Sequence, residues 1–181
     1  IRDSFIMALV SAEMSGLNIN KKTMERANEF LDRVRGGKDG GSYGYTDSPG
    51  KRNSGKNALN AVGFFCSQIL GRSPNTKKAF ESANLIDAAG FQLNDIYYVY
   101  YGTLAAYQHQ GPVWEKRLDQ MQNKFISSQL KDGSWPVGGG HGNQMGKYIA
   151  TALVTLCLEA HYRYTPIYGF CLLYTSPSPR D

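Results

Sequence analysis

The chain has 181 residues, of which 41% are hydrophobic and 19% are charged, and its formal net charge is +5 at pH 7. This length is sufficient for one domain with its own core, and no apolar run reaches the roughly 20 residues that a transmembrane helix needs. The basic residues are scattered along the chain, so we do not expect a nucleic-acid-binding face.

Segments with a charged face alternate along the chain with segments that carry almost no charge. Apolar residues recur every three or four positions in the charged segments, which is typical of amphipathic helices with one face in water. The uncharged segments are typical of helices that are buried on both sides. In chain order, the two kinds alternate at 5–14 (uncharged apart from Glu13), 21–35, 58–70, 77–86, 96–108, 113–130 and 149–158.

This alternation predicts an all-α fold, and specifically an α/α-toroid. In such a fold, antiparallel helical hairpins build a partial ring with the uncharged helices inside and the amphipathic helices outside. No β-branched runs separate the predicted helices, which argues against a parallel sheet. The Gly-rich stretches 36–44 and 138–142 are predicted to be long connections.

A short motif directly after segment 113–130 is the most informative feature of the chain. It consists of Gln129, Asp132, Gly133, Ser134 and Trp135. An echo, Gly40-Gly-Ser-Tyr43, lies 92 residues earlier, which is the length of two helical hairpins. Glycine permits a sharp turn, serine can cap exposed amides, and the aromatic ring can pack between neighbouring hairpins. We therefore interpret Trp135 as a structural repeat residue, with ligand contact as the alternative.

The run from Gln129 to Trp135 resembles the Q-x-x-D-G-S-W repeat of the squalene–hopene cyclase and prenyltransferase superfamily. Residues 8–12, 60–64, 95–101 and 151–159 add to this resemblance. It covers residues 1 to about 170 and implies an α/α-toroid with inner and outer helical rings. A complete ring of that superfamily has about twice as many helices, so the resemblance implies that this chain is the C-terminal part of a longer ring.

Residues 171–181 differ sharply in composition from the rest of the chain. They resemble a translated sequencing-adapter tail, and a short natural tail is the alternative. We expect this segment to be disordered and to lie outside the domain formed by residues 1–170.

The uncharged segment 96–108 is the best candidate for a ligand site. Tyr97, Tyr98 and Tyr101 lie in it, and tyrosine faces can stabilise cations and pack against isoprenoid chains. In a toroid this helix would line the central cavity, whereas the alternative is ordinary core packing with satisfied hydroxyl groups. His141, in a Gly-rich loop, is a further candidate at the cavity mouth.

Neither catalytic signature that the resemblance implies is present in these residues. The cyclases of the superfamily use an acidic D-x-D-D motif, and its protein prenyltransferases bind zinc through Asp, Cys and His. Asp95 stands in the context of the zinc Asp, but Tyr97 occupies the position of the Cys, so we expect neither a metal nor another cofactor. The alternative role of Asp95 is that of a helix N-cap.

The sequence thus predicts a terpenoid cyclase- or prenyltransferase-like repeat protein. Its apolar cavity would hold an isoprenoid or another hydrophobic molecule, and no catalytic residue is assigned. The alternative is a non-catalytic toroid that binds a ligand or a partner protein, because one fold can serve many functions. The sequence predicts neither the substrate nor the cellular location.

Overall fold

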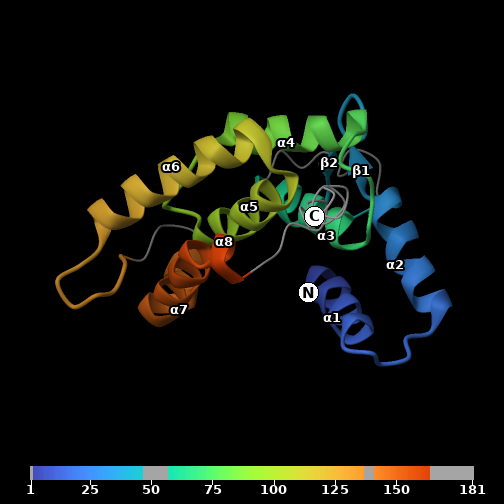
Figure 1. The fold of residues 1–181 in the computed structure, drawn as a ribbon, viewed down its shortest axis with the longest axis horizontal. Coiled ribbons are helices and arrows are strands. Elements are labelled where there is room, and N and C mark those ends of the chain that lie inside the picture. The colour runs from blue at the N-terminus through green and yellow to red at the C-terminus, as the bar shows by residue number, and fades with distance from the viewer. Residues whose placement is uncertain (1, 47–56, 137–140, 164–181) are drawn as a thin grey trace, which may run out of the picture.

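The computed structural model of the protein describes residues 2–46, 57–136 and 141–163, which form eight helices and one short hairpin (Figure 1). The helices are α1 (Arg2–Met14), α2 (Lys21–Arg33), α3 (Asn57–Ile69), α4 (Lys77–Ala89), α5 (Ile96–His109), α6 (Gly111–Ser128), α7 (His141–Leu158) and α8 (Ala160–Arg163). The strands β1 (Arg35–Gly36) and β2 (Ser42–Tyr43) pair antiparallel, with Arg35 opposite Tyr43. The predicted all-α class is confirmed.

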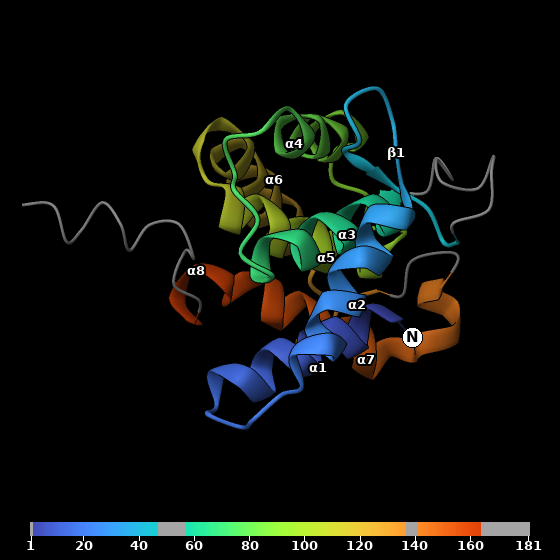
Figure 2. The same ribbon diagram turned by 90° about the vertical axis from the view of Figure 1, so that its right-hand side faces the viewer.

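The helices are arranged as an inner row and an outer layer. Helices α1, α3, α5 and α7 contact one another in chain order, while α4 and α6 pack on the outside of this row and α2 contacts α3. Helices α4 and α6 lie on one side of the α3–α5 pair, and α1 and α7 lie on the other (Figures 1 and 2). The inner row is therefore bent, and we call its side between α1 and α7 the concave face. Closure into a toroid remains a prediction.

Burial separates the two central inner helices from the outer ones. Eleven residues of α5 and nine of α3 are buried, against one in α2 and four in α6. The expectation of burial on both sides is wrong for α1 and α7, the two ends of the row. Phe5 and Met14 of α1 are 67% and 84% exposed, and Ile149 of α7 is 48% exposed, because each end helix has an inner neighbour on one side only.

Local caps and turns determine where several helices begin. Asn20, Thr76 and Asp95 each accept a backbone N–H from the first turn of α2, α4 and α5, respectively. Only Gln110 separates α5 from α6, and its φ of 63° is the only positive value among the described non-glycine residues. Within α7, the extended Gly146 (φ 76°, ψ 166°) interrupts the helix.

The predicted connection at 36–44 contains the β1–β2 hairpin, and Glu81 of α4 holds its tip. The two carboxylate oxygens of Glu81 accept the backbone N–H groups of Lys38, Asp39 and Gly41 at 2.7, 2.8 and 2.7 Å. Burial raises the pKa of this carboxyl, but the three amide donors and the Lys38 charge outweigh that effect, so the pKa lies below its ordinary value. The hairpin is thereby fixed against the outer layer.

Candidate functional site

The two Gly-Ser-aromatic elements occupy the same place in the fold, the return from an outer helix to the next inner helix. The backbone N–H of Tyr43 donates to Oδ1 of Asn60 in α3 at 2.8 Å. The backbone N–H of Trp135 donates to Oγ1 of Thr151 in α7 at 3.3 Å. Both aromatic side chains are buried. Each aromatic ring therefore packs into the core. Each outer-to-inner connection is also hydrogen-bonded to the inner helix that follows it.

A third return, between α4 and α5, also places a buried aromatic residue directly after a glycine, without the serine. Gly90 has a φ of 68°, and the buried ring of Phe91 contacts that of Phe125 edge-on, with 5.1 Å between the centroids. Phe91 lies 48 residues after Tyr43 and 44 residues before Trp135. This return was not predicted from the sequence, because it lacks the Gly-Ser-aromatic string of the other two. A buried aromatic shortly after a glycine, at a period of about 46 residues, is the signal that finds it.

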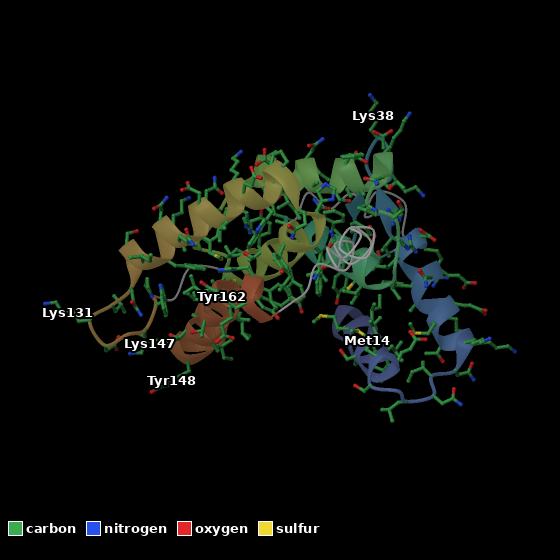
Figure 3. The ribbon with its side chains drawn as sticks, in the orientation of Figure 1. Met14, Lys38, Lys131, Lys147, Tyr148 and Tyr162 are labelled. Carbon is green, nitrogen blue, oxygen red and sulfur yellow. The ribbon has the colours of Figure 1, made fainter. Side chains whose placement is uncertain are left out.

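Polar side chains within the 129–135 motif bond to one another. Gln129 Nε2 donates to the carbonyl of Gly133 at 3.0 Å, and Asp132 Oδ1 accepts both the amide and the hydroxyl of Ser134, at 3.1 and 2.6 Å. The expectation that this serine caps helix amides is therefore replaced by a bond to Asp132. Lys147, labelled in Figure 3, pairs with Asp132 Oδ2 at 2.6 Å. The Lys147 and Ser134 donors hold the pKa of Asp132 well below its usual range.

Trp135 combines a structural contact with a place at a pocket. Its indole Nε1 donates to the carbonyl of Phe125 at 2.8 Å, which satisfies the only side-chain donor of the ring. The same side chain lines an apolar pocket of about 160 Å³ together with Leu93, Ile96 and Val154. The structural role is thus directly visible, and ligand contact at this pocket stays open as the alternative.

Three tyrosines of α5 and Phe65 of α3 form a cluster of rings, which we call the aromatic cluster. The ring of Tyr101 lies 4.8 Å from that of Tyr97, 5.1 Å from that of Tyr100 and 6.3 Å from that of Phe65. The Tyr101 hydroxyl donates to Sδ of Met7 in α1 at 3.6 Å, so the cluster lies on the α1 side of α5. Tyr101 and Phe65 are buried, whereas Tyr97 and Tyr100 are partly exposed.

The phenol at the centre of the aromatic cluster, that of Tyr101, stays neutral. Burial, together with the neighbouring Tyr97 and Tyr100, holds the pKa of Tyr101 far above its usual range. No charge therefore develops at the centre of the cluster at physiological pH, and a ligand meets ring faces around a neutral hydroxyl group. Such a surface suits an apolar or weakly cationic molecule better than an anion.

Tyr98, which was predicted together with Tyr97 and Tyr101 to line the cavity, does not line the concave face. Its side chain is 0% exposed, and its hydroxyl donates to the carbonyls of Ile86 and Gly90 at 3.1 and 2.9 Å, at the C-terminal end of α4. The Arg117 guanidinium lies over its ring, 5.1 Å from the centroid. Adjacent helical positions point about 100° apart, so Tyr98 is directed to the outer layer while Tyr97 is not.

Asp95 is the N-cap of α5. Its Oδ1 accepts the backbone N–H of Tyr98 at 3.0 Å, which matches the alternative stated for this residue. His141 was predicted to lie in a Gly-rich loop, which is wrong, because it is the first residue of α7. Its side chain lies outside the part of the chain that the structure describes, as does the Gly-rich stretch before it. Among the described residues, no group of three or more His, Cys, Asp or Glu side chains could hold a metal ion.

None of the described helices is long and apolar enough to cross a bilayer. Comparisons with protein-family models, with curated proteins and with solved structures found no match to this chain. The relation to the cyclase and prenyltransferase superfamily therefore remains a prediction from the repeat motif.

Proposed function

We propose that this chain is part of a terpenoid cyclase- or prenyltransferase-like repeat protein whose concave face binds a hydrophobic ligand at the aromatic cluster. The observation that carries this proposal is the pair of partly exposed rings, Tyr97 and Tyr100, next to the buried Tyr101. Tyrosine rings offer a large apolar area at a small cost in side-chain entropy. An isoprenoid chain is the ligand class that this surface and the repeat motif favour together.

The proposal concerns binding, because the residues at the cluster supply recognition but no acid. The cluster consists of three phenols and one phenyl ring, and Asp95, the nearest carboxylate in sequence, is engaged as a helix cap. Neutral rings of this kind stabilise positive charge only weakly at exposed sites, by about 0.5–1 kcal/mol for each contact. Ligand capture therefore depends on apolar contact first.

The second candidate is a non-catalytic module that binds a partner protein through α1 and α7. The exposed apolar side chains Phe5 in α1 and Ile149 in α7 are the observation that favours it. This candidate predicts that changes at Phe5 affect binding more than changes at Tyr97.

A titration with farnesol, followed by tyrosine fluorescence, tests the proposal. Tyr97→Ala and Tyr100→Ala should each weaken binding by about tenfold, which corresponds to the loss of about 1.4 kcal/mol of ring contact. Tyr148→Ala is the matched control, because Tyr148 is 87% exposed and points away from the body of the protein (Figure 3). No saturable binding by the unaltered protein, or equal weakening by the control, would refute the proposal.

A further inference from the structure

A second pocket lies at the C-terminal end of α3, beside the β1–β2 hairpin, and its lining is cationic. Its volume is about 180 Å³. Strands β1 and β2, the end of α3 and the start of α4 meet around it. The side chains that matter for its chemistry are those of Arg35, Tyr43, Ser67, Arg72, Thr76 and Lys78.

Positive charge exceeds negative charge around this pocket. Asp32 pairs with Arg35 Nε at 3.1 Å and with Arg72 Nη1 at 2.6 Å, so two guanidinium groups share one carboxylate. Lys78 forms no ion pair with any of the described carboxylates, although its charge acts on Asp32. Burial raises the pKa of Asp32, but Arg72, Arg35 and Lys78 outweigh it and lower the value overall. The carboxylate thus stays ionised and still leaves a cationic excess.

An unsatisfied hydroxyl group lies beside these cations. Tyr43 is 2% exposed, and its hydroxyl makes no hydrogen bond of good geometry to any described residue, although the Ser67 side chain lies close enough to oppose the rise of its pKa. The counterpart in the other Gly-Ser-aromatic element, Trp135, has its indole N–H bonded to a carbonyl. A buried hydroxyl without a partner costs about 1–3 kcal/mol, which a bound acceptor would offset. Burial also raises the pKa of the Tyr43 phenol against the opposing charge of Arg35, so the group remains a proton donor.

The start of α4 adds a third favourable element. This helix has 13 residues, and Thr76 caps it by accepting the N–H of Ala79 at 3.2 Å. Its N-terminal end carries the positive pole of the helix dipole, which favours an anion nearby. Thr76 and Lys78 both line the pocket, so the positive end of the α4 dipole and the side-chain cations both favour an anion in it.

We propose that this pocket binds a small tetrahedral oxyanion, such as a phosphate group. The Tyr43 hydroxyl donates a hydrogen bond to it, Lys78 and Arg35 balance its charge, and the start of α4 adds its dipole. A volume of about 180 Å³ accommodates one such group with a few waters. This site is separate from the concave face, so its existence does not depend on the ligand proposed there.

Isothermal titration calorimetry with inorganic phosphate, in buffers matched for ionic strength with chloride, tests the site. Tyr43→Phe should weaken phosphate binding by about five- to tenfold, the effect of one hydrogen bond to a charged group, and Lys78→Gln should weaken it to a similar degree. Lys38→Gln is the control, because Lys38 lies exposed at the hairpin tip and does not line the pocket (Figure 3). Its phosphate affinity should change less than twofold.

A second measurement separates binding from folding. Without phosphate, Tyr43→Phe should be at least as stable as the unaltered protein, because it removes the unsatisfied hydroxyl and keeps the ring. Added phosphate should raise the melting temperature of the unaltered protein by more than it raises that of Tyr43→Phe. The same titration with glycerol phosphate shows whether a free or an esterified phosphoryl group is preferred, and binding of either supports the site. The proposal is overturned if phosphate binds no better than chloride, or if Tyr43→Phe and Lys38→Gln bind it equally well.

Discussion

The backbone N–H of Tyr43 donates to the side-chain oxygen of Asn60 at 2.8 Å, and both residues are buried. This bond connects the β1–β2 hairpin to the first turns of α3, and the bond between Trp135 and Thr151 makes the same connection to α7. A polar side chain of the next inner helix thus receives the amide of the aromatic residue before it, in the first turn of α3 and after the Gly146 interruption in α7. The outer-to-inner return is held by a specific hydrogen bond as well as by apolar packing.

Asn60→Ala should destabilise the protein by about 1–3 kcal/mol, because it leaves the buried amide of Tyr43 without an acceptor. Urea-induced unfolding, followed by circular dichroism, measures this change. Thr151→Val is the comparison and should cost less, since its bond is longer, at 3.3 Å, and its surroundings are less buried. Equal costs at the two positions would contradict this account of the return.

Gly63→Ala should be strongly destabilising, by about 1–3 kcal/mol or more, because a Cβ at this position would overlap the ring of Tyr43. Thermal unfolding checks the size of the effect. The clash depends on the ring, so in a Tyr43→Ala background the added cost of Gly63→Ala should shrink, as a double-mutant cycle would show. An unchanged cost in that background would place the origin of the effect elsewhere.

Glu81→Gln should make the free energy of unfolding depend less strongly on pH in the acid range. The folded-state pKa of Glu81 is lowered, so its contribution is fully present above the ordinary pKa of the carboxyl and is lost as the pH falls through the lowered value. Glutamine has nearly the shape of the glutamate side chain but no charge. The difference in the free energy of unfolding between the variant and the unaltered protein should therefore disappear at low pH. Denaturant midpoints between about pH 2 and pH 7 measure it, and Glu29→Gln, on the exposed side of α2, controls for net charge.

Gln110→Gly should stabilise the protein, by about 1 kcal/mol. Gln110 has φ 63° and ψ −169°, a conformation that is accessible almost only to glycine. The loss of its side-chain hydrogen bond to the carbonyl of Tyr107 opposes this gain only in part. Gln110→Ala keeps the backbone strain and removes the same bond, so it should be less stable than Gln110→Gly in a thermal unfolding experiment.

Charge alternation was sufficient to predict α1 to α7, though not the short α8, and the burial of α3 and α5. It could not predict that Phe5 and Ile149 are exposed, because a hydrophobic pattern does not reveal whether a neighbour is present on each side. The third return was also missed, since Phe91 shares its position in the fold with Tyr43 and Trp135 but not their flanking serine. A short sequence motif identifies a structural repeat only where the residues of the motif have been retained.

The candidate site was predicted at the level of the helix but not of every side chain. Tyr97, Tyr98 and Tyr101 are close in sequence, yet Tyr98 faces the carbonyls at the end of α4 while Tyr101 faces α1. Helical geometry separates neighbouring positions, and which direction is inward depends on packing partners distant in sequence. The cationic pocket was not foreseen for the same reason, since Arg35, Arg72 and Lys78 come together only through the hairpin and α4.

The three buried aromatics, Tyr43, Phe91 and Trp135, give each outer-to-inner return its own anchor. Coupling between such units acts chiefly between neighbours, so a helical pair can be duplicated, deleted or exchanged without redesigning the others. A chimera that replaces the segment between two of these aromatics with another of about 46 residues should keep its remaining contacts. Whole helical hairpins can thus be added or removed. The length of the protein can change in evolution or by design while each outer-to-inner return keeps its aromatic anchor.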